Sequence, residues 1–349
     1  MEQIAFIYGS VFVYWSHILL AMAAGVAVFL YLALCLSEAE NCVAVFISVP
    51  LAAVLSLVLG RLLHWYCRPD QYADLVSAVT DYRSGSYALA GVFAGCLLTA
   101  CFLRLIRLSK NLPGMLDCMA IAGCGGIAVG RLSCFFNGAD RGVVVTSLQG
   151  LPWALEVTNP VSGVQELRLA TFFLQALVAG MLFLVLLVFW LTTRRQKMQR
   201  NGDAFLLFLL CYGASQVLLD STRYDSLYFR SNGFVSVVQV LGACGLGLAA
   251  IVFSVRLVRS RGWKRWYLLL WVLLAGMIGL GGYMEYFVQR HSHKVVTGYT
   301  VMTVALLGIV VLAVVIRSLA VSAEKKRQLH TAWIEQGIPE ESYGGDEHG

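Results

Sequence analysis

Residues 130–142 read GRLSCFFNGADRG, and the organisation of the chain follows from where this stretch lies. It ends an apolar segment, residues 115–129, so that Arg131 falls at or just inside a membrane boundary. A guanidinium at that depth is costly unless it is paired, and such residues usually face a bundle interior or a water-filled cavity. The sequence therefore predicts helices packed around a cavity that contains Arg131.

The composition is that of a membrane protein. The 349 residues are 59% hydrophobic and 13% charged, which leaves too little polar surface for an ordinary soluble fold. We predict an all-α polytopic membrane protein with about nine transmembrane helices. The expected spans are residues 8–37, 42–66, 86–105, 115–134, 169–191, 204–219, 234–254, 266–287 and 297–316. The first apolar segment has no basic region and no cleavage site before it, so we expect it to be retained as a span.

Basic residues indicate the orientation in the membrane. Clusters of Lys and Arg follow the third, fifth, seventh and ninth spans, which all end on one side. The positive-inside rule makes that side cytoplasmic, with the N-terminus outside and the C-terminus in the cytoplasm. We interpret the net charge of +6 as this orientation signal and expect no nucleic-acid partner. Residues 67–85 then face outward and are expected to contain a short interfacial helix, whereas the polar tail, residues 323–349, is expected to be cytoplasmic and poorly ordered.

The ten cysteines are scattered, and none is in CxxC spacing. Because a metal site needs clustered ligands, we expect no metal and interpret the cysteines as buried apolar side chains.

A second arginine repeats the context of the first. Gly60-Arg61-Leu62 ends the second span as Gly130-Arg131-Leu132 ends the fourth, and both reach the outer side. Two guanidiniums at similar depth would make one phosphate-binding site, whereas the alternative is that each snorkels to the headgroup layer. Small residues favour close packing of the fourth span and an inward Arg131; these are Gly123, Gly125, Gly126 and Gly130.

The sixth span carries Gln216, Asp220 and Arg223 at helical spacing, so they share one face. Two interpretations remain open for the last two residues: an internal Asp220–Arg223 pair, or a direct role in substrate binding. In the seventh span, Gln239 is expected to make a hydrogen bond between helices. In the outer loop, Trp153 is expected to be an interfacial anchor.

These motifs resemble a known family. Residues 130–142 are similar to the signature of bacterial prolipoprotein diacylglyceryl transferases, which is close to GRLGNFINGELWG; the matching residues include Arg131, Phe135, Asn137, Gly138 and Gly142. LVLGRLLHWY around Arg61, LPWA at residues 151–154 and YGASQVLLDSTR in the sixth span also resemble elements of the family. The resemblance covers roughly residues 6–258. It implies a seven-span diacylglyceryl-transferase-like domain at residues 1–258, followed by two additional helices at residues 259–322 and the tail.

The resemblance implies a reaction in the bacterial plasma membrane. An sn-1,2-diacylglyceryl group moves from phosphatidylglycerol to the thiol of a prolipoprotein lipobox cysteine, and glycerol phosphate is released, with no cofactor. The partners are then phosphatidylglycerol, the prolipoprotein signal peptide and the bilayer. The chemistry needs a thiolate and cations aimed at the departing phosphate. The implied catalytic residues are Arg131, Asn137, Asp220 and Arg223; headgroup binding is assigned to Arg61, Arg131, Arg141, Gly142 and Gln216, and His64 is the candidate base.

The departures from the family pattern fall on polar positions. The family's Asn, Glu and essential Arg are replaced by Cys134, Ala139 and Gln216, the later Glu is Asp220, and Arg141 stands where the signature has Trp. The family's histidine has no counterpart in YALAG, residues 87–91. One hypothesis is that the Arg141 cation compensates for the change at position 216. Two alternatives follow: a catalytically altered or inactive member that binds lipid or a membrane-protein partner, and, more remotely, a small-solute transporter.

Overall fold

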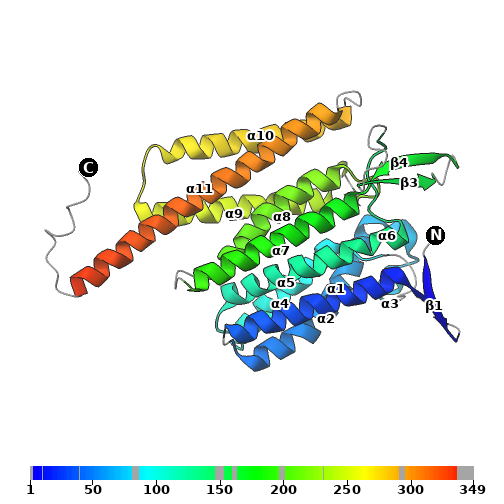
Figure 1. Cartoon of the computed structure of the whole chain (residues 1–349), viewed down its shortest axis with the longest axis horizontal. Helices are drawn as coiled ribbons and strands as arrows, with labels where there is room; N and C mark the ends of the chain where they lie inside the picture. Colours follow the sequence, from blue (N-terminus) through cyan, green and yellow to red (C-terminus); the bar gives the residue numbers. More distant parts are fainter. Residues whose placement is uncertain are drawn as a thin grey trace. The chain divides into compact units, whose positions relative to one another are not determined.

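The computed structural model describes residues 3–9, 11–38, 40–80, 86–145, 153–158, 163–195, 201–230, 232–290 and 295–335. The chain divides into two compact units, Met1–Leu246 and Gly247–Gly349. Figure 1 shows that the described part is helical apart from short two-stranded hairpins. The all-α polytopic architecture expected from the sequence is confirmed.

The first unit holds most of the elements. Its helices are α1 (Trp15–Ser37), α2 (Cys42–Cys67), α3 (Leu75–Thr80), α4 (Leu89–Leu105), α5 (Leu112–Leu132), α6 (Cys134–Asn137), α7 (Thr171–Arg195) and α8 (Asp203–Ser221), with a 3-10 turn at Pro69–Gln71. Its strands pair as β1 (Ile4–Tyr8) with β2 (Val11–Tyr14), β3 (Ala154–Thr158) with β4 (Gln165–Leu169), and β5 (Tyr228–Phe229) with β6 (Asn232–Ser236). The boundary between the units falls inside α9 (Val237–Arg261); the second unit continues with α10 (Tyr267–Arg290) and α11 (Val295–Glu335).

The expected spans agree with the helices except at the first and third spans, and the tail also differs from its expectation. In the described residues eight helices are long and apolar enough to cross a membrane, and α4 is a shorter apolar helix at the position of the third expected span. Residues 8–14 do not begin the first span, because they belong to the β1–β2 hairpin. Its β-branched and aromatic residues favour strands, and Gly9, with φ +60°, makes the turn. The tail was expected to be poorly ordered from residue 323, but α11 continues to Glu335.

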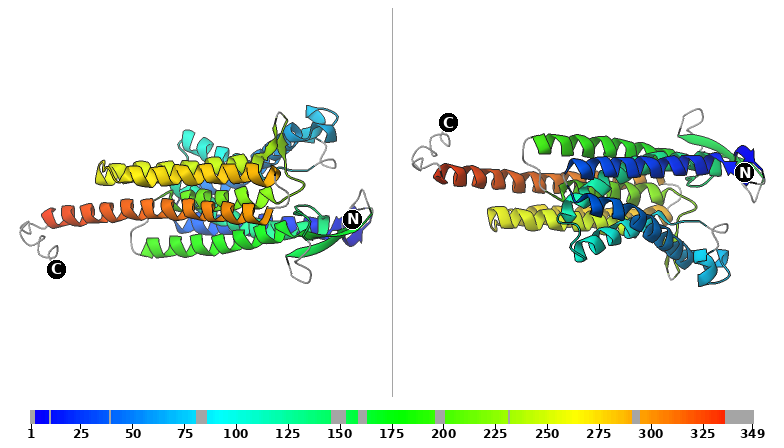
Figure 2. Two further views of the ribbon diagram at one scale, coloured as in Figure 1. Left: turned by 90° about the horizontal axis from the view of Figure 1, so that it is seen from above. Right: turned by 90° about the horizontal axis from the view of Figure 1, so that it is seen from below.

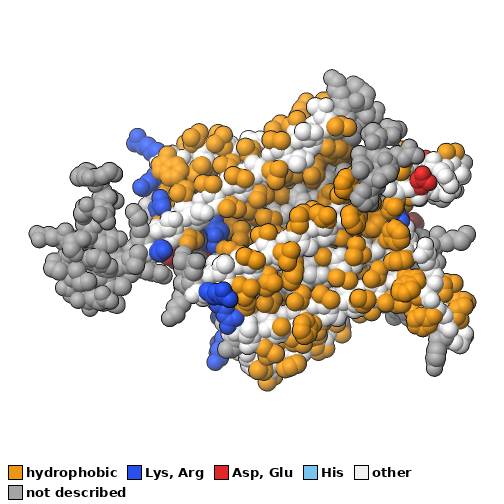
Figure 3. Space-filling model, viewed as in Figure 1, with side chains coloured by type: hydrophobic (Ala, Val, Ile, Leu, Met, Phe, Trp, Pro, Cys, Tyr) orange, Lys and Arg blue, Asp and Glu red, His pale blue; other side chains and the backbone are white. Residues whose placement is uncertain are grey.

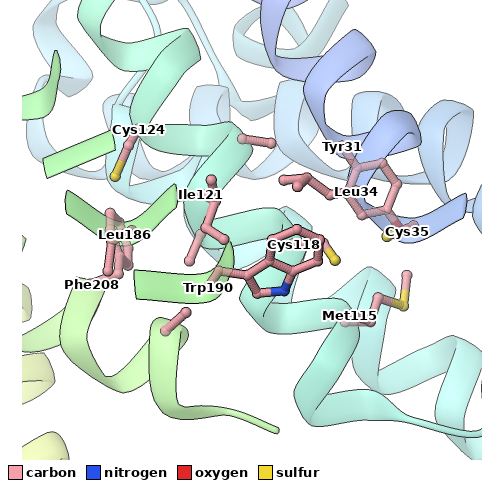
Figure 4. Close-up of a cluster of buried hydrophobic side chains, with 14 of the residues drawn as sticks. Tyr31, Leu34, Cys35, Met115, Cys118, Ile121, Cys124, Leu186, Trp190 and Phe208 are labelled. Carbon is pink, nitrogen blue, oxygen red and sulfur yellow. The ribbon is translucent and has the colours of Figure 1, made fainter. Parts of the chain in front are cut away.

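Helix α5 is the central helix of the first unit and packs against α1, α7 and α8. Figure 4 shows side chains from these four helices meeting in one core, among them Tyr31, Ile121, Leu186 and Phe208. Glycine permits the close approach to α1: a Cβ at Gly126 would lie 2.8 Å from the Cβ of Ala27. The expectation of tight packing along the fourth span is thereby confirmed.

The sequence predicted that the cysteines are buried apolar side chains, and this holds for only some of them. Four of the ten cysteines are buried, among them Cys118 and Cys124 in the α5 core, whereas Cys42, Cys101 and Cys244 are exposed on their helices. The exposed thiols lie on apolar helices, where lipid can cover them.

The surface fits a bilayer. Figure 3 shows hydrophobic side chains over the visible sides of the helices, with Lys and Arg gathered near helix ends. In the first unit the two hairpins β1–β2 and β3–β4 lie with α3 and α6 at one end of the helices, as the views in Figures 1 and 2 agree. The short helix expected in residues 67–85 is α3, which exposes Leu75, Val76 and Val79; its place at the membrane interface stays a prediction. The chain is therefore a multi-pass membrane protein.

Candidate functional site

The stretch that follows α5 folds back on itself. After the single turn of α6, Gly138 takes a left-handed conformation with φ +75°, and Asp140 another with φ +56°. The Oδ1 of Asn137 accepts the N–H of Ala139 at 2.9 Å and so closes the turn. This reversal carries the side chain of Asp140 back beside Arg131, at the end of α5.

Asp140 is a buried carboxylate shared by two arginines. Nη1 of Arg131 donates to its Oδ2, and Nη2 of Arg223 pairs with its Oδ1. All three side chains are at most 12% exposed. Burial alone would raise the pKa of the Asp140 carboxyl, but the two guanidiniums outweigh burial and hold this pKa below its usual range. Arg131 thus points into the bundle, as the sequence predicts.

Arg223 has two further carboxylates. Its Nη1 donates to Asp220 at 3.0 Å, and its Nη2 lies 3.0 Å from Asp225. Burial would lower the pKa of Arg223, but the three carboxylates raise it. The internal Asp220–Arg223 pair is therefore present, and Asp220 also accepts a hydrogen bond from the Ser236 hydroxyl. We call Arg131, Asp140, Asp220, Arg223 and Asp225 the ionic cluster; two positive and three negative groups give it a net charge of −1.

Backbone contacts fix the exit of the turn. The N–H of Gly142 donates to the carbonyl of Leu169 at 2.7 Å, and Gly142 forms an antiparallel bridge with Arg223. A Cβ at Gly142 would lie 2.4 Å from Oγ1 of Thr171, so only glycine fits there. Gly142 thus holds the turn against β4 and the segment after α8, and its contact with the headgroup stays a prediction.

Arg141 lies beside the ionic cluster but has no carboxylate partner among the described residues. It is 7% exposed, its guanidinium lies over the Phe172 ring at 4.9 Å, and Nη2 donates to the Phe135 carbonyl at 3.3 Å. Within the described chain its Nε and Nη1 have no hydrogen-bond partner. Burial lowers the pKa of Arg141, the opposite of the shift at Arg223.

Arg61 belongs to a second side-chain cluster, with Tyr72, Tyr87 and His64. It is 2% exposed, its Nη1 donates to the Tyr72 hydroxyl at 3.3 Å, and its guanidinium lies over the rings of Tyr72 and Tyr87. Nδ1 of His64 is 2.8 Å from the same hydroxyl. The structure therefore groups Arg131 with Arg223, and Arg61 with His64. The burial of Arg61 and Arg131 does not fit the snorkelling alternative.

Two glutamines connect neighbouring helices through hydrogen bonds. Gln216, 2% exposed, accepts a hydrogen bond at 3.3 Å from Gln175 of α7. Gln239 donates to the carbonyl of Val217 at 3.3 Å, which confirms the expected bond between helices. Of the LPWA element, residues 151 and 152 lie outside the described chain, and Trp153 is 37% exposed with its carbonyl accepting from the N–H of Ala170.

Sequence reasoning missed part of the cluster. Asp140 and Asp225 were not singled out, and Cys134, noted only as a departure from the family pattern, donates its thiol to Asp140 at 3.4 Å. The sequence offers one signal for Asp140. The family signature has Glu where this chain has Ala139, and Asp140 places a carboxylate one residue later. For Asp225 the sequence offers one signal: it is an acidic residue two positions after Arg223.

Comparison with known proteins decides the family. The sequence model described as prolipoprotein diacylglyceryl transferase matches residues 3–255, well over half of the chain. The chain belongs to the prolipoprotein diacylglyceryl transferase family. The match contains every residue of the ionic cluster as well as Arg61 and Arg141, and it ends before α10 and α11.

Two relatives in this family of transferases bear the name phosphatidylglycerol--prolipoprotein diacylglyceryl transferase. The protein of Finegoldia magna is 24% identical over 248 residues, covering 69% of this chain and 92% of its own length. The protein of Streptococcus pneumoniae (strain Hungary19A-6) is 27% identical over 206 residues, covering 58% and 74% respectively. The family resemblance inferred from the motifs is thereby confirmed.

Proposed function

We propose that this chain transfers an sn-1,2-diacylglyceryl group from phosphatidylglycerol to the lipobox cysteine of prolipoproteins, in the bacterial plasma membrane. The observation that supports it best is the buried Arg131–Asp140–Arg223 arrangement, which falls inside the matched family region. Buried charged groups in a membrane bundle are expensive and mark functional sites.

The reaction forms a C–S bond and breaks a C–O bond. The cysteine sulfur attacks the glycerol carbon that bears the phosphate ester, the C–O electron pair leaves with glycerol phosphate, and the thiol proton passes to a base. Arg131 and Arg223 supply positive charge where negative charge develops on the leaving group. Asp140 and Asp220 position these guanidiniums, and Asn137, whose Oδ1 closes the turn, contributes its Nδ2 as a donor to the headgroup.

The second cluster, with Arg61 and His64, has a supporting role in the proposal. The hydroxyl of Tyr72 contacts both Arg61 and Nδ1 of His64. A histidine held in this way keeps one ring nitrogen for a proton, which is what a base requires. We propose that Arg61 makes a second contact with the lipid headgroup, in addition to Arg131 and Arg223, and that His64 is the candidate base.

A second function is favoured by one specific observation. Where the family pattern has an essential Arg, Gln216 is neutral and bonded to Gln175, and the ionic cluster has net charge −1. Both features reduce the positive charge available to a leaving phosphate. They favour a non-catalytic member that binds lipid or a membrane-protein partner.

One experiment separates the two. The purified chain is reconstituted with phosphatidylglycerol and a lipobox peptide, and the peptide mass and released glycerol phosphate are measured beside an active family enzyme. We expect a diacylglyceryl increment with the wild type and its loss with Arg131→Ala. If the control enzyme works and this chain gives no increment, the transferase proposal is rejected in favour of lipid or partner binding.

A further inference from the structure

We propose that Arg141 binds the phosphate of a glycerophospholipid headgroup and is the residue that sets the affinity for the lipid substrate. The identity of the lipid rests on the proposed function, whereas the anion site rests on the structure alone. The ligand class is a phosphate ester of glycerol, either in a lipid headgroup or as free glycerol phosphate.

The charges around the turn point to Arg141. Arg131 and Arg223 share Asp140, and Arg223 also pairs with Asp220 and Asp225, so their charge is already matched by carboxylates. An approaching phosphate would meet a cluster of net charge −1. Arg141 is the adjacent cation whose charge is not matched in this way, and adding it brings the sum to zero. Arg141 therefore offers an incoming phosphate a charge that no carboxylate among the described residues already pairs with.

The guanidinium of Arg141 is held in position, but two of its nitrogens have no hydrogen-bond acceptor among the described residues. Nη2 is held by the Phe135 carbonyl at 3.3 Å, and the ring of Phe172 lies 4.9 Å below the guanidinium. These two contacts fix the plane of the group. Nε and Nη1, both buried, carry N–H groups that find no acceptor among the described residues. A buried donor without an acceptor is costly, and guanidinium N–H groups match phosphate oxygens in geometry and charge.

The position of Arg141 ties its ligand to the ionic cluster. Its carbonyl accepts the N–H of Tyr224 at 3.3 Å, and its neighbours in the chain are Asp140 and Gly142, which contact Arg223. The residues on either side of Arg141 thus contact Arg223, and a phosphate on Arg141 would leave the contacts of Asp140 with Arg131 and Arg223 in place. In this proposal Arg141 anchors the lipid phosphate, and Arg131 and Arg223 stabilise the departing oxygen.

The test measures binding directly. Wild type, Arg141→Ala, Arg141→Lys and Arg141→Gln are titrated in uncharged detergent with dihexanoyl phosphatidylglycerol, sn-glycerol 1-phosphate and inorganic phosphate. A charge-assisted hydrogen bond corresponds to roughly 10- to 100-fold in affinity. We expect that loss for Arg141→Ala, partial recovery with Arg141→Lys, and a raised KM for the lipid with kcat changed much less. The matched control is Arg230→Ala, an exposed arginine that contacts Tyr66 and should change affinity less than twofold.

The outcomes are distinct. Tighter binding of the lipid than of both free phosphates identifies the headgroup as the ligand, and similar binding identifies the phosphate group itself. If Arg141→Ala fails to fold, Arg141→Gln, which keeps a donor for the Phe135 carbonyl, gives the result. Binding of all three ligands as tight as in the wild type by a folded Arg141 variant overturns the inference, whether or not transfer occurs. Arg141-dependent binding without any transfer to a lipobox peptide supports the inference and rejects the proposed reaction.

Discussion

Removing the charge of Asp140 should destabilise the first unit more than removing any other carboxylate of the ionic cluster. Asp140 accepts from Arg131, Arg223 and Cys134. In Asp140→Asn, Arg223 keeps Asp220 and Asp225, but Arg131 loses the carboxylate with which it pairs. Breaking a buried ion pair costs about 3–5 kcal/mol. Because Asn retains one acceptor oxygen, we expect a loss of about 3 kcal/mol.

The assay is equilibrium unfolding in mixed micelles, with the free energy of unfolding compared among variants. Asp225→Asn is the matched control, since Asp225 is 27% exposed and Arg223 keeps its two other carboxylates. We expect the control to lose about 1 kcal/mol. Equal losses for the two variants, or a loss below about 1 kcal/mol for Asp140→Asn, would refute the reasoning that the shared carboxylate stabilises the buried arginines.

Three further predictions concern the pH dependence of stability, the packing of α5 on α1 and the start of α8. Because the pKa of folded Asp140 lies below the ordinary value of about 3.9, its stabilisation is present above that pH and is lost as pH falls through the folded pKa; unfolding measured across acidic pH should show this limb in the wild type and not in Asp140→Asn. Gly126→Ala should cost about 1–3 kcal/mol in the same unfolding assay, since its Cβ would press on α1, whereas Gly123→Ala, with open space around it, should be neutral or slightly stabilising. Asp117→Ala should cost about 1–3 kcal/mol, because its carboxylate accepts two backbone N–H groups at the start of α8, and Asp117→Asn should lose less; hydrogen exchange at those amides checks this.

Hydropathy was sufficient to predict the bundle, but the ends of the elements needed more. Membrane spans need long apolar segments, so most of the helices could be placed from the sequence. The β1–β2 hairpin was missed because residues 4–14 are as apolar as a span, and periodicity does not separate a short strand pair from a helix start. The extension of α11 was missed because polar composition does not exclude a helix.

The site shows the same division. Arg131 and Arg223 were found because charges at membrane depth are rare. Asp140, the partner of Arg131, was not found from the sequence. Their contact depends on the left-handed backbone conformations of Gly138 and Asp140, which reverse the chain and cannot be read from residue spacing. Arg61 was expected beside Arg131 because both end spans at similar depth. Depth alone does not give the direction of a side chain around the bundle: Arg61 contacts Tyr72 and Arg131 contacts Asp140, and a phosphate site shared by the two arginines stays a prediction.

The turn that brings Asp140 to Arg131 also has a meaning for biogenesis. The two residues are nine positions apart in one continuous segment, so the cation and its counter-ion leave the ribosome within moments of each other. Arg131 can therefore enter the bilayer as half of a neutral pair, at a lower insertion cost than a bare guanidinium, before α8 has been synthesised. Arg223 arrives later and completes a site whose most expensive charge has already been accommodated.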